Sequence, residues 1–173
     1  VFDASVSGAE WWTQVIGSGD DIGFHWDKDY ALEGNGINIC PQIASVTYLN
    51  NIGAPTMIID HVTPLTCDDS IQGHVDTSYV SFPLIGKHIS FDGRLLHGSP
   101  ADFASDNAGN SAIAKRVTLL VNIWLNHKPV TAVPLPTPVI DKLTTPPQLA
   151  VLNGFNFIPE VPTEVGIEGS SEG

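Results

Sequence analysis

Two short segments carry side chains suited to binding a metal ion. The first, residues 24–29, reads F-H-W-D-K-D. Positions two apart in a strand face the same side, so His25 and Asp27 project together, with Cα atoms about 6.5–7 Å apart. In the second, residues 93–100, His97 ends an apolar run just before a Gly-Ser-Pro turn. Two imidazoles and one carboxylate on one face of an octahedral ion leave adjacent positions open, which suits non-haem Fe(II). These residues therefore predict an iron centre.

The spacing of the candidate ligands disfavours the alternatives to an iron centre. An H-x-D pair alone is most often a coincidence on a solvated strand, and the distant His97 is what changes that interpretation. Structural zinc needs four closed ligands, and Cys40 and Cys67 do not have CxxC spacing. We expect both thiols to be unlinked, and Asp29 to be a solvated carboxylate at a strand end rather than part of the site's rim. We expect the remaining histidines at the surface or at strand ends: His61, His74, His88 and His127.

One of the two arginines lies in a core-like strand. Arg116 opens the run R-V-T-L-L-V-N-I-W-L, nineteen positions after His97. A buried guanidinium is costly unless an anion meets it, and its planar fork matches a carboxylate. The alternative is an arginine at a strand end, exposed or paired with a surface acid. Alternation predicts that one face of the run carries Arg116, Thr118, Leu120, Asn122 and Trp124.

The elements that must position these side chains are short β-like runs separated by turn residues. Clusters of Gly, Asn, Asp and Ser predict the turns, and no long helical periodicity is present. We therefore expect a mainly β domain over residues 1–128, built as a two-sheet jelly roll or barrel with minor helices. The eight predicted strands span 11–16, 22–27, 43–49, 56–60, 79–83, 88–91, 94–97 and 116–125.

The chain changes character after residue 128. Eight of its thirteen prolines fall between Pro129 and Pro162. Because proline cannot donate to a ladder, we predict that residues 129–173 form an extended segment that packs in part on the barrel. The apolar residues expected to make that contact are Leu149, Val151, Leu152, Phe155 and Phe157.

Composition narrows the class of partner. The formal charge is −12, and the only adjacent basic pair lies inside a predicted strand, so we expect neither nucleic acid nor an anionic membrane as partner. The longest apolar stretch, 117–125, is about half of the ~20 residues that a spanning helix needs, so we expect a soluble protein. The first residues show no charged-then-apolar leader, and we predict no compartment.

Together these motifs resemble the 2-oxoglutarate/Fe(II)-dependent dioxygenases. The resemblance covers residues 10–127 and rests on H-x-D, on His97 in the context F-D-G-R-L-L-H-G-S, and on Arg116 opening the next strand. The stretch S-V-T-Y-L-N at 45–50, followed by G-A-P-T at 53–56, is similar to the prolyl-hydroxylase-like branch. The resemblance implies a double-stranded β-helix, also called a cupin-like jelly roll.

The resemblance also implies roles and co-substrates. Arg116 and Tyr48 would hold the C5 carboxylate of 2-oxoglutarate beside Fe(II), with O2 as oxidant and ascorbate as a supporting reductant. The products would be succinate, CO2 and a hydroxylated protein side chain or small molecule. Val15 stands where several relatives carry a tyrosine. Thr13, on the same face, or Asn122 is expected to supply the missing polar contact to the co-substrate.

Two rival functions are compatible with the same motifs. One is a metal-dependent cupin-type enzyme that does not use 2-oxoglutarate, which requires Arg116 to face solvent or a protein acid. The other is a non-catalytic binding module on the same barrel, against which an intact metal triad argues. A fold alone does not choose between them.

Overall fold

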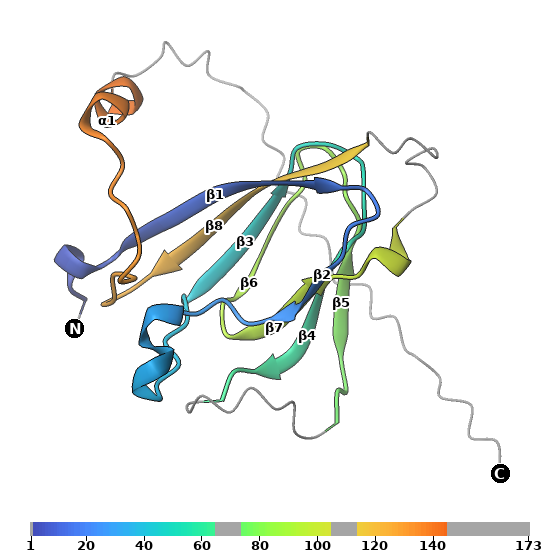
Figure 1. The fold of residues 1–173 in the computed structure, drawn as a ribbon, viewed down its shortest axis with the longest axis horizontal. Coiled ribbons are helices and arrows are strands. Elements are labelled where there is room, and N and C mark those ends of the chain that lie inside the picture. Colours follow the sequence, from blue (N-terminus) through green and yellow to red (C-terminus); the bar gives the residue numbers. More distant parts are fainter. Residues whose placement is uncertain (1, 65–73, 105–113, 145–173) are drawn as a thin grey trace. The chain divides into compact units, whose positions relative to one another are not determined.

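The computed structural model describes residues 2–64, 74–104 and 114–144 and is mainly β (Figure 1). Two antiparallel sheets of four strands make up the fold. The first sheet has the order β1 (Gly8–Gly17), β8 (Lys115–Trp124), β3 (Ile43–Tyr48) and β6 (His88–Asp92). The second has the order β2 (Ile22–His25), β7 (Leu95–Ser99), β4 (Thr56–Val62) and β5 (Ser78–Ser81).

All eight predicted strands are confirmed, with ends that differ by a few residues. The helices of the described residues are short, as expected: η1 (Ala4–Val6), η2 (Tyr30–Asn35), η3 (Ala101–Phe103) and α1 (Thr137–Thr144). None of these helices is both long and apolar enough to cross a membrane.

Strand β8 explains how one face of the first sheet comes to line the interior. Its buried positions alternate, because Arg116, Thr118, Asn122 and Trp124 are buried while the residues between them are partly exposed. This confirms the predicted face. Side chains on it reach the other sheet, since Arg116 donates to Thr56 of β4 at 3.0 Å. The core between the sheets therefore contains a polar layer as well as apolar side chains.

The chain divides into two compact units, Val1–Thr131 and Ala132–Gly173. The expectation of a purely extended C-terminal segment is corrected by α1. This helix tolerates Pro138 because proline in the first turn removes no hydrogen bond that the helix would otherwise make there. The backbone N–H groups of Val139 and Ile140 both donate to the carbonyl of Pro136. The apolar residues predicted to pack back, Leu149 to Phe157, lie outside the described residues.

The prediction of two unlinked thiols is tested for Cys40 only. Cys40 is a buried free thiol, and burial raises its pKa, which keeps it protonated. Cys67 lies outside the described residues. Cys40 therefore contributes to the core as a small apolar side chain.

Candidate metal centre and the buried arginine

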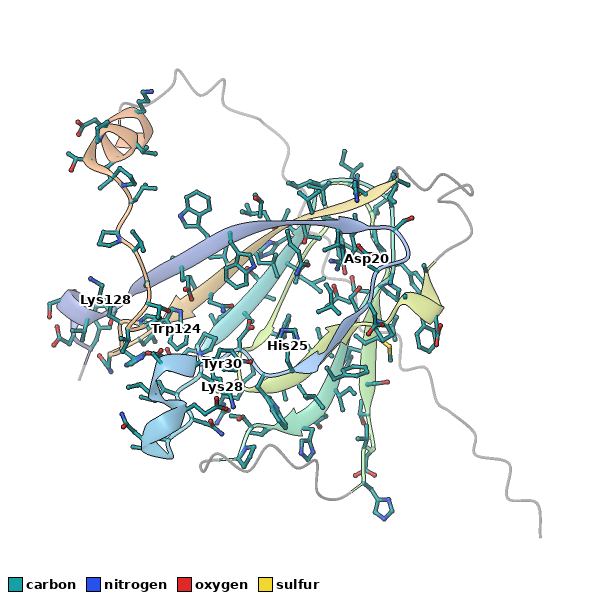
Figure 2. All side chains as sticks on the ribbon, in the orientation of Figure 1. Asp20, His25, Lys28, Tyr30, Trp124 and Lys128 are labelled. Carbon is teal, nitrogen blue, oxygen red and sulfur yellow. The ribbon has the colours of Figure 1, made fainter. Side chains whose placement is uncertain are left out.

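The three residues predicted to bind a metal converge. His25 and His97 are direct partners across the β2–β7 ladder, and their ring centroids lie 4.5 Å apart. Asp27 follows two residues after His25. Its carboxylate oxygens lie 3.7 Å from Nε2 of His25 and 3.6 Å from Nε2 of His97. One ligand atom from each residue falls within 4.8 Å of the others, a spacing that can hold one ion. Figure 2 labels His25 on β2.

Backbone contacts orient both imidazoles. Nδ1 of His25 lies 2.8 Å from the carbonyl oxygen of Gly23, and Nδ1 of His97 lies 2.9 Å from that of Leu95. A carbonyl only accepts, so Nδ1 carries the proton in each ring and Nε2 keeps its lone pair for a metal. Burial lowers the pKa of His97, while the charge of Asp27 opposes that shift. The lowered pKa favours the neutral form of His97, in which Nε2 can bind a metal.

Asn122 supports the third ligand. Its Nδ2 donates to Oδ2 of Asp27 at 3.1 Å, from the inner face of β8 on the opposite sheet. The structure gives Asn122 a contact with Asp27, one of the three candidate ligands, and the contact expected between Asn122 and the co-substrate stays a prediction. Hydrogen bonds of this kind orient a ligating carboxylate and raise its affinity for a metal.

Arg116 is buried, with 3% of its surface exposed, and no described residue supplies it with a carboxylate. The three acceptors that it has among the described residues are neutral: the carbonyl of Ala54 at 3.1 Å, Oε1 of Gln14 at 3.2 Å and Oγ1 of Thr56 at 3.0 Å. Burial lowers the pKa of Arg116 as a consequence. The other arginine, Arg94, forms an exposed pair with Asp92 at 2.6 Å. Arg116 therefore differs from an ordinary ion-paired arginine.

Tyr48 lies beside this guanidinium, as the resemblance implies. The ring of Tyr48 is 5.6 Å from the guanidinium carbon of Arg116, and its hydroxyl is 2.7 Å from both Oγ1 of Thr56 and the carbonyl of Ser81. Thr118, two residues along β8, is fully buried, and its hydroxyl has no hydrogen-bond partner in the described part of the chain. Such an orphan is rare unless a ligand or water satisfies it.

The expectation for Thr13 is wrong. Thr13 is exposed on the outer face of β1, where Val15 also lies, and the inward positions are Glu10, Trp12, Gln14 and Ile16. Gln14 contacts Arg116 in its place and was not predicted. The signal in the sequence was that Gln14 is polar while the residues two positions before and after it, Trp12 and Ile16, are apolar. That signal was ambiguous, because Trp11 and Val15 give the outer face an equally apolar pattern.

Asp29 also needs correction, because it is buried rather than solvated. Its carboxylate lies 2.8 Å from Nε2 of His127 and accepts from the backbone N–H of Val130 at 2.9 Å and of Ala31. Burial alone would raise the pKa of Asp29, but the hydrogen bonds from Val130 and His127 outweigh it and lower that pKa. Asp29 therefore ties the loop after β2, which carries Asp27, to the segment after β8.

Searches against protein-family models, curated proteins and solved structures found no match to this chain. The geometry of the site itself therefore indicates its chemistry. A set of two imidazoles and one carboxylate fits Fe(II) and leaves adjacent positions for other ligands. The buried guanidinium of Arg116, which has no carboxylate partner among the described residues, lies on the inner face of the opposite sheet and adds a position for an anion.

Proposed function

We propose that this chain is an Fe(II)- and 2-oxoglutarate-dependent dioxygenase. The observation that carries the proposal is Arg116. It is buried among neutral acceptors, on the same inner face of β8 as Asn122, which contacts the metal ligand Asp27. A single molecule with a metal-chelating end and a distal carboxylate would satisfy both the metal centre and the guanidinium, and 2-oxoglutarate has that form.

The strand order supports a double-stranded β-helix for the proposed enzyme. β1 pairs with β8, β2 with β7, β3 with β6 and β4 with β5. These are the pairs of one long hairpin that has been rolled up so that its halves fall into two sheets, which is how a jelly roll is built. Its interior is the place where this architecture holds small ligands.

The chain's own residues would then share the work as follows. His25 and His97 offer Nε2 and Asp27 a carboxylate oxygen to Fe(II), and Asn122 keeps that carboxylate in place. Arg116 would hold the C5 carboxylate. The bound metal would supply the activation of O2 that is coupled to decarboxylation of 2-oxoglutarate to succinate and CO2, with ascorbate keeping the iron reduced.

The neighbours of Arg116 would make the anion pocket selective. The hydroxyl of Thr118 lacks a partner among the described residues, and it faces inward from the position between Arg116 and Leu120. A co-substrate oxygen could satisfy it. Tyr48 packs its ring on the guanidinium and fixes Thr56, so it would position the pocket as well as line it. Burial excludes water, which strengthens the attraction between the guanidinium and a carboxylate.

The geometry disfavours both rivals. A triad-only cupin enzyme requires Arg116 to meet solvent or a protein acid, and within the described residues it meets neither. A vestigial binding module has no need for two imidazoles held with Nε2 free and a carboxylate held by Asn122. We therefore favour hydroxylation of a protein side chain or small molecule, in the manner of the prolyl-hydroxylase-like branch.

The proposal is tested by comparing two 2-oxo acids. The anaerobic Fe(II)-loaded protein is titrated with 2-oxoglutarate and with pyruvate, which chelates equally well but lacks the distal carboxylate. The visible absorption band of the chelate reports binding. We expect 2-oxoglutarate to bind at least about 100-fold more tightly, since a buried charge pair is lost with pyruvate. Admitting O2 and ascorbate should then release succinate. Equal affinities for the two acids, or no succinate, would contradict the proposal.

A further inference from the structure

Glu10 is an inward-facing carboxylate of the first sheet that has no role in the proposed function. Glu10 lies on β1, where alternate positions face inward, and its Cα is paired with that of Asn122 on β8. Because directly opposed side chains on one face have Cβ atoms about 4.5–5.5 Å apart, Glu10 and Asn122 are neighbours. Asn122 in turn contacts Asp27 at 3.1 Å. Glu10 is therefore separated from the metal ligands by a single side chain.

Glu10 has one hydrogen bond and no cation among the described residues. Its Oε2 accepts from Nε1 of the buried Trp124 at 3.2 Å. None of the ion pairs in the described part of the chain includes Glu10. A carboxylate has about four acceptor sites, so most of the capacity of Glu10, including Oε1, is left for another donor. A partly buried carboxylate that no side-chain cation pairs with is costly to desolvate, so this position favours a cationic ligand.

The two charged groups of this inner face lie at different levels along the first sheet, since Glu10 is paired with Asn122 and Arg116 with Ile16. Along β8, Arg116 is six residues before Asn122, or about 20 Å at 3.3–3.4 Å per residue, whereas Trp124 is two residues after it. The co-substrate would occupy the side toward Arg116. The side toward Glu10 and Trp124 is then left for the prime substrate. Figure 2 labels both Trp124 and His25.

We propose that the prime substrate carries a cationic amine or guanidine that Glu10 binds next to the metal. The inference rests on the proposed function for its account of what the site does with the substrate. Trp124 is the positioning residue, because its indole N–H holds one carboxylate oxygen and leaves the other free. The net charge of −12 would also draw cations toward the protein.

The test uses the full chain loaded with Mn(II), which replaces Fe(II) without redox chemistry and broadens the proton signals of molecules bound near it. The probes are N-acetyl-lysine methylamide and its uncharged counterpart N-acetyl-norleucine methylamide, in the presence of 2-oxoglutarate. We expect the lysine probe to be broadened at its terminal CH2 and to bind about 10- to 100-fold more tightly than the norleucine probe. A third probe, n-butylammonium, tests whether the substrate is a free amine or a side chain within a peptide. Tighter binding of n-butylammonium than of the lysine probe indicates a free amine, and the reverse indicates a peptide.

The variant is Glu10→Gln, which keeps an oxygen for Trp124 and removes the charge. It should lower affinity for the lysine probe to that of the norleucine probe while leaving Mn(II) affinity unchanged. Asp60→Asn removes an exposed charge on β4 and should change neither. Equal binding of the two probes to the parent protein would overturn the inference, and so would full lysine binding by Glu10→Gln. Loss of Mn(II) binding in that variant would make Glu10 a metal ligand instead.

Calorimetry with 2-oxoglutarate on the same samples separates this inference from the proposed function. If 2-oxoglutarate binds but the probes do not discriminate, only the cationic substrate is refuted. If the lysine probe binds through Glu10 but 2-oxoglutarate does not bind, the cation site stands and the dioxygenase proposal falls.

Discussion

Replacing Arg116 with methionine isolates the group on which the proposed function depends. A guanidinium has five N–H donors, and three of those of Arg116 reach Ala54, Gln14 and Thr56. Among the hydrogen bonds of the described residues, one N–H remains on each terminal nitrogen, which is the arrangement needed to hold both oxygens of a carboxylate. Two charge-assisted bonds of about 1.5–3 kcal/mol each predict a loss of about 3–6 kcal/mol, or roughly 150- to 20,000-fold in 2-oxoglutarate affinity.

The assay is the anaerobic titration with 2-oxoglutarate and pyruvate, applied to both proteins. Arg116→Met should abolish the preference for 2-oxoglutarate but leave pyruvate and Fe(II) binding nearly unchanged. Arg116→Lys should recover only part of the preference, since a point charge does not reproduce the fork. The matched control is Arg94→Met, which removes the other arginine from its exposed pair with Asp92 and should have no effect. If Arg116→Met still prefers 2-oxoglutarate as the parent does, the buried guanidinium does not bind the distal carboxylate.

Three further predictions concern other parts of the site. His97→Ala should abolish binding of stoichiometric Fe(II), measured anaerobically, and a variant that binds iron like the parent would refute the triad. Gly53→Ala and Gly86→Ala both strain a left-handed residue at a cost of about 1 kcal/mol, but only at Gly53 would the new Cβ meet Arg116, at 2.7 Å. In the same titration only Gly53→Ala should weaken 2-oxoglutarate binding. Asp29→Asn should lower the free energy of unfolding by about 1–3 kcal/mol at pH 7. Because folding lowers the pKa of Asp29, the difference in unfolding free energy between parent and variant should shrink as pH falls below 3.8. Urea unfolding at pH 7 and at pH 3 measures this difference. An equal difference at both pH values would contradict the prediction.

Local patterns predicted the strands and the triad well, because both depend on short spacings. The inner face of β8 followed from two-residue alternation, and His25 and Asp27 from the same period. The inner face of β1 did not follow, since Trp11 and Val15 make its outer face apolar too, and so Thr13 was chosen where Gln14 is the neighbour of Arg116. The burial of Asp29 depends on His127, which is 98 residues away. No local pattern encodes a contact of that range.

The β1–β8 ladder joins the two ends of the first unit. Gly17 lies opposite Lys115 and Gly8 opposite Trp124, so its partners are 98 to 116 positions apart (115 − 17 and 124 − 8). Pairings of such long range form slowly, because the entropy cost of closing a long loop comes before the stabilising contacts are made. Glu10, Arg116 and Asn122 all lie on this ladder. The proposed sites for the co-substrate and for the cation therefore form only after β1 and β8 have paired. Small molecules that bind there would therefore prolong the life of the folded chain by slowing unfolding, while the rate at which new chains fold would stay the same.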